Sequence, residues 1–311
     1  MQFKNIFVDR HAEIRSGWKA LIYLVIVSVF IGGISAIRLI GLNLIYLGPI
    51  LTVVCILGAS FVMTRFFHRK PLTAIGLSLH PGIFRNFGVG CLLGFLMMTG
   101  IFVVEYSLGY FRVHWLGLAT GEIALVLTSS LVLFAIAAFA EELIFRGYLL
   151  QILIQGLMFL PAAIIVSALF AALHSQNPAA GTLPLINVGL AGVWLSLAYM
   201  KTRSLWLPFG LHFSWNFSQT TLYAFPTSGV EFVDKKMFAS TQTGPEWFTG
   251  GAFGPEGGAL ATLALILCTG YILKAKYLVA PQGIITLDSL EDLLPPQTPP
   301  RRDNGEGEEI A

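Results

Sequence analysis

Three charged residues stand together inside a long apolar stretch of the sequence. Glu141, Glu142 and Arg146 are the only Asp, Glu, Lys or Arg residues between Ala124 and Met200. A charge at membrane depth costs at least ~2.5–3.5 kcal/mol, so such residues usually have a function. On a helix, Glu142 and Arg146 share a face and can pair, whereas Glu141 points about 100° away from Glu142. The spacing predicts that the arginine holds one carboxylate and leaves the other free for chemistry. The alternative is a purely structural ion pair with a spare glutamate.

The composition is that of a membrane protein. Of the 311 residues, 55% are hydrophobic and 12% are charged, whereas a soluble domain carries about 25% charged residues. We therefore expect an all-α, polytopic helix bundle whose surroundings are a lipid bilayer, with no nucleic-acid partner. Cys55, Cys91 and Cys268 lie far apart in apolar stretches, which is typical of small core residues rather than of disulfides or metal ligands.

The apolar runs predict about eight membrane-spanning helices. They cover approximately 18–37, 44–64, 86–108, 123–150, 159–174, 183–200, 205–223 and 259–278. Residues 1–17 would form an N-terminal segment, 18–278 the transmembrane domain with its motifs in about 123–223, and 279–311 a proline-rich, charged and disordered tail. The first run has no small-residue cleavage signature, so we expect it to remain as a membrane helix.

The positions of lysine and arginine predict the orientation. With the N-terminus inside, fourteen of them fall in inner segments and four, namely Arg38, Arg112, Lys235 and Lys236, in outer segments. Because such residues favour the cytoplasmic side, we expect both termini in the cytoplasm.

A histidine on the next apolar helix is a candidate partner for the free carboxylate. Glu141 lies 15 residues before Gly156 and His174 lies 18 residues after it, so both would sit roughly 22–27 Å from the shared turn. At equal depth, the carboxylate could orient the imidazole, or both groups could hold one water. The alternative is a polar residue satisfied near the membrane interface.

A second pair of polar side chains falls on the helix over 205–223. His212 and Asn216 are four residues apart and so share one face. They could donate to an oxyanion, or they could simply hydrogen-bond between helices. His212 lies only about 12 Å from the turn at Lys201–Arg203, which is shallower than the depth expected for His174.

The three blocks, in this order, resemble a known family. Glu-Glu-x-x-x-Arg at 141–146, Phe-x-x-x-His at 170–174 and His-x-x-x-Asn at 212–216 are similar to the motifs of the CAAX-protease and bacteriocin-processing (ABI or CPBP) family of intramembrane proteases. Its eukaryotic members, the type II CAAX prenyl endopeptidases, remove the last three residues of prenylated proteins. The resemblance implies an integral protein of a membrane such as the bacterial plasma membrane, acting on a membrane-associated peptide or protein.

The resemblance also implies a role for each motif residue. Glu141 and His174 would activate a water for attack on the scissile carbonyl, and His212 and Asn216 would stabilise the tetrahedral oxyanion. Glu142 and Arg146 would be supporting residues. We expect no cofactor, because these groups suffice without an ion and no His-Glu-x-x-His helix is present. The alternative is a zinc site made of Glu141, His174 and His212.

Other function classes stay open at this point. A non-catalytic scaffold or bacteriocin-immunity protein could use the same fold, and a transporter could use the same buried charges. The glycine-rich loop at 244–258 could be a lid, a lateral entrance or a plain connection. The sequence gives neither the substrate nor whether it is prenylated.

Overall fold

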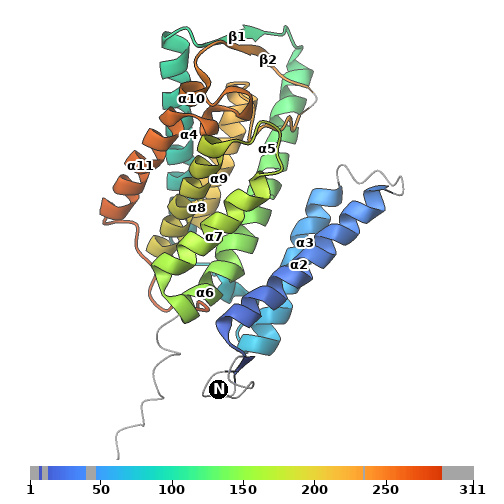
Figure 1. The fold of residues 1–311 in the computed structure, drawn as a ribbon, viewed down its shortest axis with the longest axis vertical. Coiled ribbons are helices and arrows are strands. Elements are labelled where there is room, and N and C mark those ends of the chain that lie inside the picture. Colours follow the sequence, from blue (N-terminus) through green and yellow to red (C-terminus); the bar gives the residue numbers. More distant parts are fainter. Residues whose placement is uncertain (1–6, 9–12, 40–46, 234, 289–311) are drawn as a thin grey trace, which may run out of the picture.

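The structure is an all-α helix bundle of the kind found in membranes, as the composition predicts (Figure 1). This computed structural model describes residues 7–8, 13–39, 47–233 and 235–288. The main helices are α2 (Ser16–Leu39), α3 (Leu47–Val62), α4 (Ile83–Ser107), α5 (Thr120–Glu142), α6 (Leu150–Leu157), α7 (Phe159–His174), α8 (Thr182–Thr202), α9 (Trp206–Phe217), α10 (Glu246–Thr249) and α11 (Ala259–Lys274).

Short π- and 3-10-helical segments modify these helices. The π segment η1 (Met63–His68) extends α3, η3 (Leu143–Leu149) joins α5 to α6, and η4 (Ser218–Leu222) extends α9. The 3-10 turns are η2 (Leu72–Ile75), η5 (Gly251–Phe253) and η6 (Pro255–Gly257). Each of the eight predicted helices therefore has a counterpart. Within the described ranges, five helices are long and apolar enough to cross a membrane, and α7 and α11 are shorter apolar helices.

Helix α9, which carries His212 and Asn216, is held against α4 by small residues. A Cβ added at Gly90 would lie 2.5 Å from the Leu207 carbonyl oxygen, and one added at Gly94 would lie 2.2 Å from Ser214 Oγ. On the other side, a Cβ at Gly210 would lie 2.4 Å from the carbonyl oxygen of Phe87. Small residues four apart let two membrane helices approach closely. This close contact of Gly90 and Gly94 with α9 is called the glycine seam below. It fixes the position of His212, which lies between Gly210 and Ser214.

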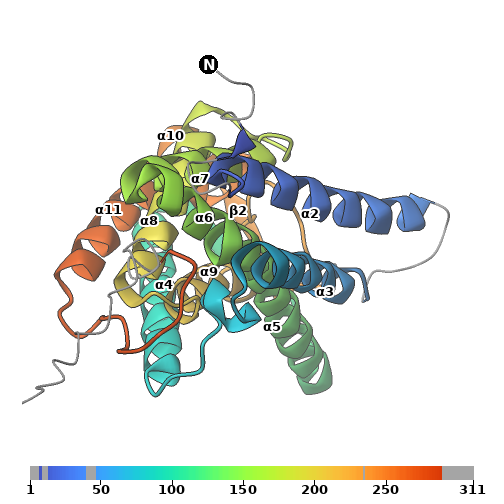
Figure 2. The same ribbon diagram turned by 90° about the horizontal axis from the view of Figure 1, so that it is seen from below.

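The α2–α3 hairpin lies at the edge of the bundle, where it packs on α5 and α6 (Figure 2). The opposite end from the N-terminus carries a two-stranded antiparallel sheet that the sequence did not predict. Its strands β1 (Phe111–Trp115) and β2 (Phe238–Gln242) pair Phe111 with Gln242. The sheet ties the two long connections of this end together (Figure 1).

The beginning of the predicted tail is part of the folded protein. Leu287 is fully buried and Asp288 is 4% exposed, whereas we expected residues from 279 onward to contribute no core. The reason is a set of polar side chains at the ends of several helices that bind this backbone. Lys70 Nζ donates to the Thr286 carbonyl (2.7 Å), the Leu287 N–H donates to Gln151 Oε1 (2.7 Å), Gln155 Nε2 donates to the Leu287 carbonyl, and Arg203 pairs with Asp288. Residues 286–288 are called the strap below.

The predicted division into three segments otherwise stays a prediction. Residues 289–311 of the predicted tail and most of residues 1–17 lie outside the described residues.

The arrangement leads to a prediction about membrane sidedness. Gly244 follows β2 at the end of the bundle opposite the N-terminus (Figure 1), and the strap lies at the N-terminal end. We expect a reporter inserted at Gly244 to face the outside and one fused to the C-terminus to face the cytoplasm. The reason is that lysine and arginine concentrate in the segments predicted to lie on the same side as both termini. Alkaline phosphatase and fluorescent-protein fusions measure this directly. Reporters that both face one side would contradict the helix count.

Candidate active site

The first block of motif residues lies where α5 passes into the π segment η3. All seven residues of η3 are buried, and π turns inside α-helices often occur at functional sites. Arg146 Nη1 donates to Glu142 Oε1 at 2.9 Å, and neither side chain is exposed to solvent. This is the pair that the spacing predicts. The side chain of Glu141, by contrast, is 37% exposed.

Two further contacts connect Arg146 to neighbouring helices. Its Nη2 donates to the carbonyl oxygen of Gly192 on α8 at 3.0 Å, and its guanidinium lies 4.9 Å from the centre of the Phe170 ring. A guanidinium within about 6 Å of an aromatic face is attracted to it. Gly192 itself lies tightly against Ser167 of α7, since a Cβ added there would be 2.7 Å from Ser167 Oγ. The arginine therefore joins the motif helix to both α7 and α8.

His212 contacts both glutamates. Its Nδ1 lies 2.9 Å from Glu142 Oε1, and its Nε2 lies 3.7 Å from Glu141 Oε2. An ionised carboxylate only accepts, so Nδ1 carries the proton and donates to Glu142. Glu142 is thus shared by Arg146 and His212. A carboxylate in this place holds the ring, and in a doubly protonated ring Nε2 is a donor as well.

The structure brings His212 and His174 to one cavity, although their estimated distances from the nearest turns differ. The estimate assumed that the turn at Lys201–Arg203 lies at the membrane surface. In the structure, Ser204 and Leu205 are fully buried, and the Leu205 N–H donates to the Gly76 carbonyl at 3.0 Å. The turn is covered by the end of η2 and by the strap, so α9 begins inside the protein.

His174, at the end of α7, is oriented by its own helix. Its Nδ1 lies 2.8 Å from the carbonyl oxygen of Phe170. Because a carbonyl only accepts, Nδ1 carries the proton and Nε2 of the neutral ring is left as an acceptor. The backbone, rather than Glu141, therefore orients the imidazole. Of the two arrangements considered from the sequence, a water shared by Glu141 and His174 is the one compatible with this contact.

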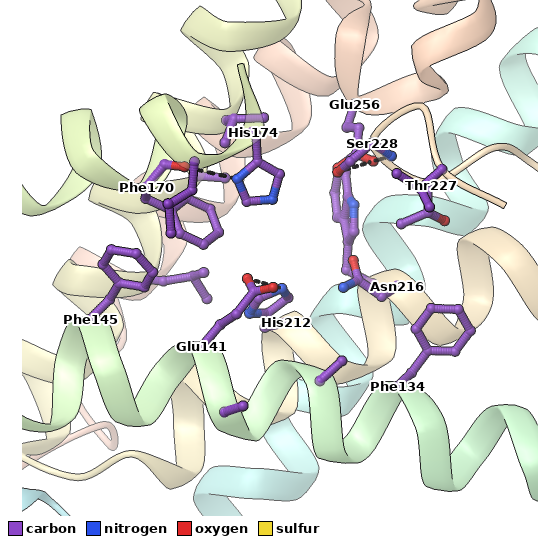
Figure 3. Close-up of a pocket in the computed structure, with 18 of the residues that line it drawn as sticks. Phe134, Glu141, Phe145, Phe170, His174, His212, Asn216, Thr227, Ser228 and Glu256 are labelled. Carbon is purple, nitrogen blue, oxygen red and sulfur yellow. Dashed lines mark hydrogen bonds and ion pairs between the residues drawn. The ribbon is translucent and has the colours of Figure 1, made fainter. Parts of the chain in front are cut away.

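The four predicted reactive residues line one cavity of about 530 Å³ (Figure 3). Glu141 comes from α5, His174 from α7, and His212 and Asn216 from α9. The remaining wall is mostly apolar and includes Phe134, Phe145, Phe170, Trp194, Trp215 and Phe232, with Ile31, Pro49 and Thr52 of the α2–α3 hairpin. Ligand sites are typically apolar cavities with a few convergent polar groups. Glu142 and Arg146 lie behind this wall.

The sequence analysis missed one acidic residue of the cavity. Glu256 of η6 lines it together with Thr227 and Ser228 (Figure 3). The only available signal was its position in the glycine-rich segment singled out as a lid, an entrance or a connection. The structure makes that segment part of the cavity wall.

The expectation of a metal-free site and its zinc alternative both stay predictions. Throughout the described ranges, no three His, Cys, Asp or Glu side chains come together in a group that could hold a metal ion. Glu141, His174 and His212 all border the cavity, but they do not converge in that way. The three cysteines are free thiols, two partly buried and one buried.

The comparison with known proteins agrees with this geometry. Residues 123–218 match the family model described as type II CAAX prenyl endopeptidase Rce1-like. This segment is Rce1-like. It contains all three motif blocks, so the resemblance inferred from them is confirmed.

The match to a curated relative is longer than the Rce1-like segment. The uncharacterized protein YyaK of Bacillus subtilis (strain 168) is 25% identical over 165 residues, which cover 52% of this chain and 52% of YyaK. The chain thus spans about half the length of the curated relative it matches.

The buried pair gives a testable prediction. We expect Arg146→Ala to lower protein yield and the thermal unfolding midpoint in detergent, because Glu142 would keep a buried charge without its main partner. Breaking such a pair costs ~3–5 kcal/mol. The matched control is Lys236→Ala, which breaks the exposed Lys236–Glu231 pair and should cost at most ~1 kcal/mol. An Arg146→Ala protein that folds like wild type and is merely inactive would move Arg146 from a supporting to a catalytic role.

Proposed function

We propose that the protein is an intramembrane endopeptidase that hydrolyses a peptide bond of a membrane-associated substrate. The observation that carries the proposal is the convergence of Glu141, His174, His212 and Asn216 from three helices on one apolar cavity. The Rce1-like match of the same segment supports the same class of reaction.

The hydrogen bonds divide the reaction between the two histidines. His174 offers an unprotonated Nε2, so it and Glu141 can take a proton from a water held between them. The water oxygen then attacks the carbonyl carbon, and negative charge develops on the carbonyl oxygen. His212 Nε2–H and the Asn216 amide are donors that can stabilise this oxyanion. Glu142 holds His212 in place, and Arg146 holds Glu142.

The cavity wall indicates the kind of substrate. An apolar, aromatic lining bordered by the α2–α3 hairpin suits a lipophilic or membrane-embedded peptide. The proposal does not require a prenyl group on the substrate. A scaffold or immunity protein on the same fold remains the second candidate, and it would need the fold but not the reactive groups.

The first test of the proposal is removal of the proposed base. We expect Glu141→Gln and His174→Ala to lower the cleavage rate roughly 10²–10⁴-fold, the usual contribution of a general base, with an unchanged unfolding midpoint. The assay is cleavage of a tagged membrane-protein library in proteoliposomes, with the new termini identified by mass spectrometry. His114→Ala, at an exposed histidine of β1, is the matched control. Full activity of Glu141→Gln would show that the base is wrongly assigned. If Glu141→Gln still confers immunity in cells, the scaffold function is favoured.

A second test concerns metal dependence. We expect cleavage to persist after washing with a chelator, and elemental analysis of the active protein to show no stoichiometric zinc, because the proposed groups complete the reaction without an ion. Stoichiometric zinc whose removal and return switch activity off and on would overturn this expectation.

A further inference from the structure

Glu256 is a second carboxylate of the cavity, and one of its oxygens is fully occupied. Oε1 accepts hydrogen bonds from the Ser228 N–H, from Ser228 Oγ at 3.0 Å and from Gln219 Nε2 at 3.0 Å. The backbone next to it is also held, since Asn187 Nδ2 donates to the carbonyls of Glu256 (2.9 Å) and Gly258 (2.8 Å). The side chain is therefore fixed in direction.

The loops that carry these groups are locked by close backbone contacts. A Cβ at Gly254 would lie 2.1 Å from the Pro226 carbonyl oxygen, and one at Gly229 would lie 1.9 Å from that of Pro178. Ser228 has a positive φ of 49°, a conformation that costs energy in a residue other than glycine and that clusters at functional sites. It turns both donors of Ser228 toward Glu256. These contacts pack the loops at this wall closely against each other.

The second oxygen of Glu256, Oε2, is available to a molecule bound in the cavity. In the part of the chain that the structure describes, Oε2 accepts no hydrogen bond, and the residue keeps partial exposure on the cavity side. Figure 3 shows Glu256 and His174 bordering the same part of the cavity, with Glu141, His212 and Asn216 across from them. Burial raises the pKa of Glu256 above its ordinary value, although Gln219, Ser228 and the nearby His174 act in the opposite direction.

We propose that Glu256 is the general acid of the reaction, which delivers a proton from Oε2 to the nitrogen of the departing amine. The inference rests on the proposed peptidase function and adds a catalytic residue to it. As the C–N bond of the tetrahedral intermediate breaks, its electron pair goes to the nitrogen, which takes the Oε2 proton and leaves as a neutral amine. Glu256 becomes a carboxylate, and the proton that Glu141 and His174 took from the water returns it to the acid form.

The chemistry of the site favours a separate acid. An amide nitrogen cannot leave as an anion, so hydrolysis needs a proton donor beside it. His174 Nδ1 is committed to the Phe170 carbonyl and His212 Nδ1 to Glu142, and Asn216 has no transferable proton. The proton that Glu141 and His174 take from the water is the other source, and the general-acid role assigns this proton to the return of Glu256 to its acid form. Paired titratable groups in different environments commonly divide acid and base roles in this way. The competing interpretation is that Glu256 only clamps the turn at Ser228.

The test compares two leaving groups. The first probe is a fluorogenic peptide with a site that the wild-type protein cleaves in the library assay. The second is the same peptide with a thioester in place of the scissile amide. A thiol has a pKa of ~8.5, so the thiolate leaves without protonation. We expect Glu256→Gln, whose amide oxygen can still accept from Ser228 and Gln219, to lower kcat for the peptide roughly 10²–10⁴-fold and to leave thioester cleavage nearly unchanged. Glu141→Gln should lose both activities, and Glu246→Gln, at an exposed glutamate of α10, should lose neither.

Each other outcome has a distinct meaning. Equal loss of both activities in Glu256→Gln, or full retention of peptide cleavage, would overturn the general-acid role. If Glu256→Gln does not fold, Glu256→Asp keeps an acidic proton, and a selective loss of peptide over thioester cleavage is again required. A wild-type protein that cleaves nothing in the library, and so supplies no cleavage site for the probes, would overturn the proposed peptidase function itself, and the role of Glu256 with it.

Discussion

The site depends on one buried chain of charged groups, Arg146–Glu142–His212. Each member would be costly to bury alone, because removing a charge from water is repaid only by good pairing and hydrogen bonds. Glu142 Oε1 satisfies both neighbours at 2.9 Å, and Arg146 also binds the Gly192 carbonyl. Helices α5, α8 and α9 are therefore joined at the depth where the cavity lies. The glycine seam between α4 and α9 holds the other side of α9.

This chain gives two neighbouring glutamates, and two histidines, opposite properties. Glu142 is hydrogen-bonded to Arg146 and His212, whereas Glu141, one residue earlier, lines the cavity. His174 donates from Nδ1 to a neutral carbonyl oxygen, whereas His212 donates from Nδ1 to a carboxylate. The residue type alone does not assign a role here; the hydrogen-bond partner of Nδ1 does.

Much of this could be predicted from sequence because it is local or periodic. The Glu142–Arg146 pair follows from helical spacing, and the isolation of its charges in an apolar stretch marked the site. That His212 reaches the same cavity as His174 could not be predicted. Counting residues along a straight helix does not show that Gly76 and the strap cover the turn before α9. Glu256 was missed for a related reason. Its position depends on close backbone approaches at Gly254 and Gly229, which leave no periodic pattern in the sequence.

Hydrogen bonds connect the strap to the helix that carries Glu142 and Arg146. Gln151, which receives the Leu287 N–H, also donates to the Gly147 carbonyl at 2.6 Å, and Gly147 adjoins Arg146. Only these few bonds separate residues 286–288 from Arg146. A change in this segment, which is far from the motif helix in sequence, therefore has a short hydrogen-bonded route to it.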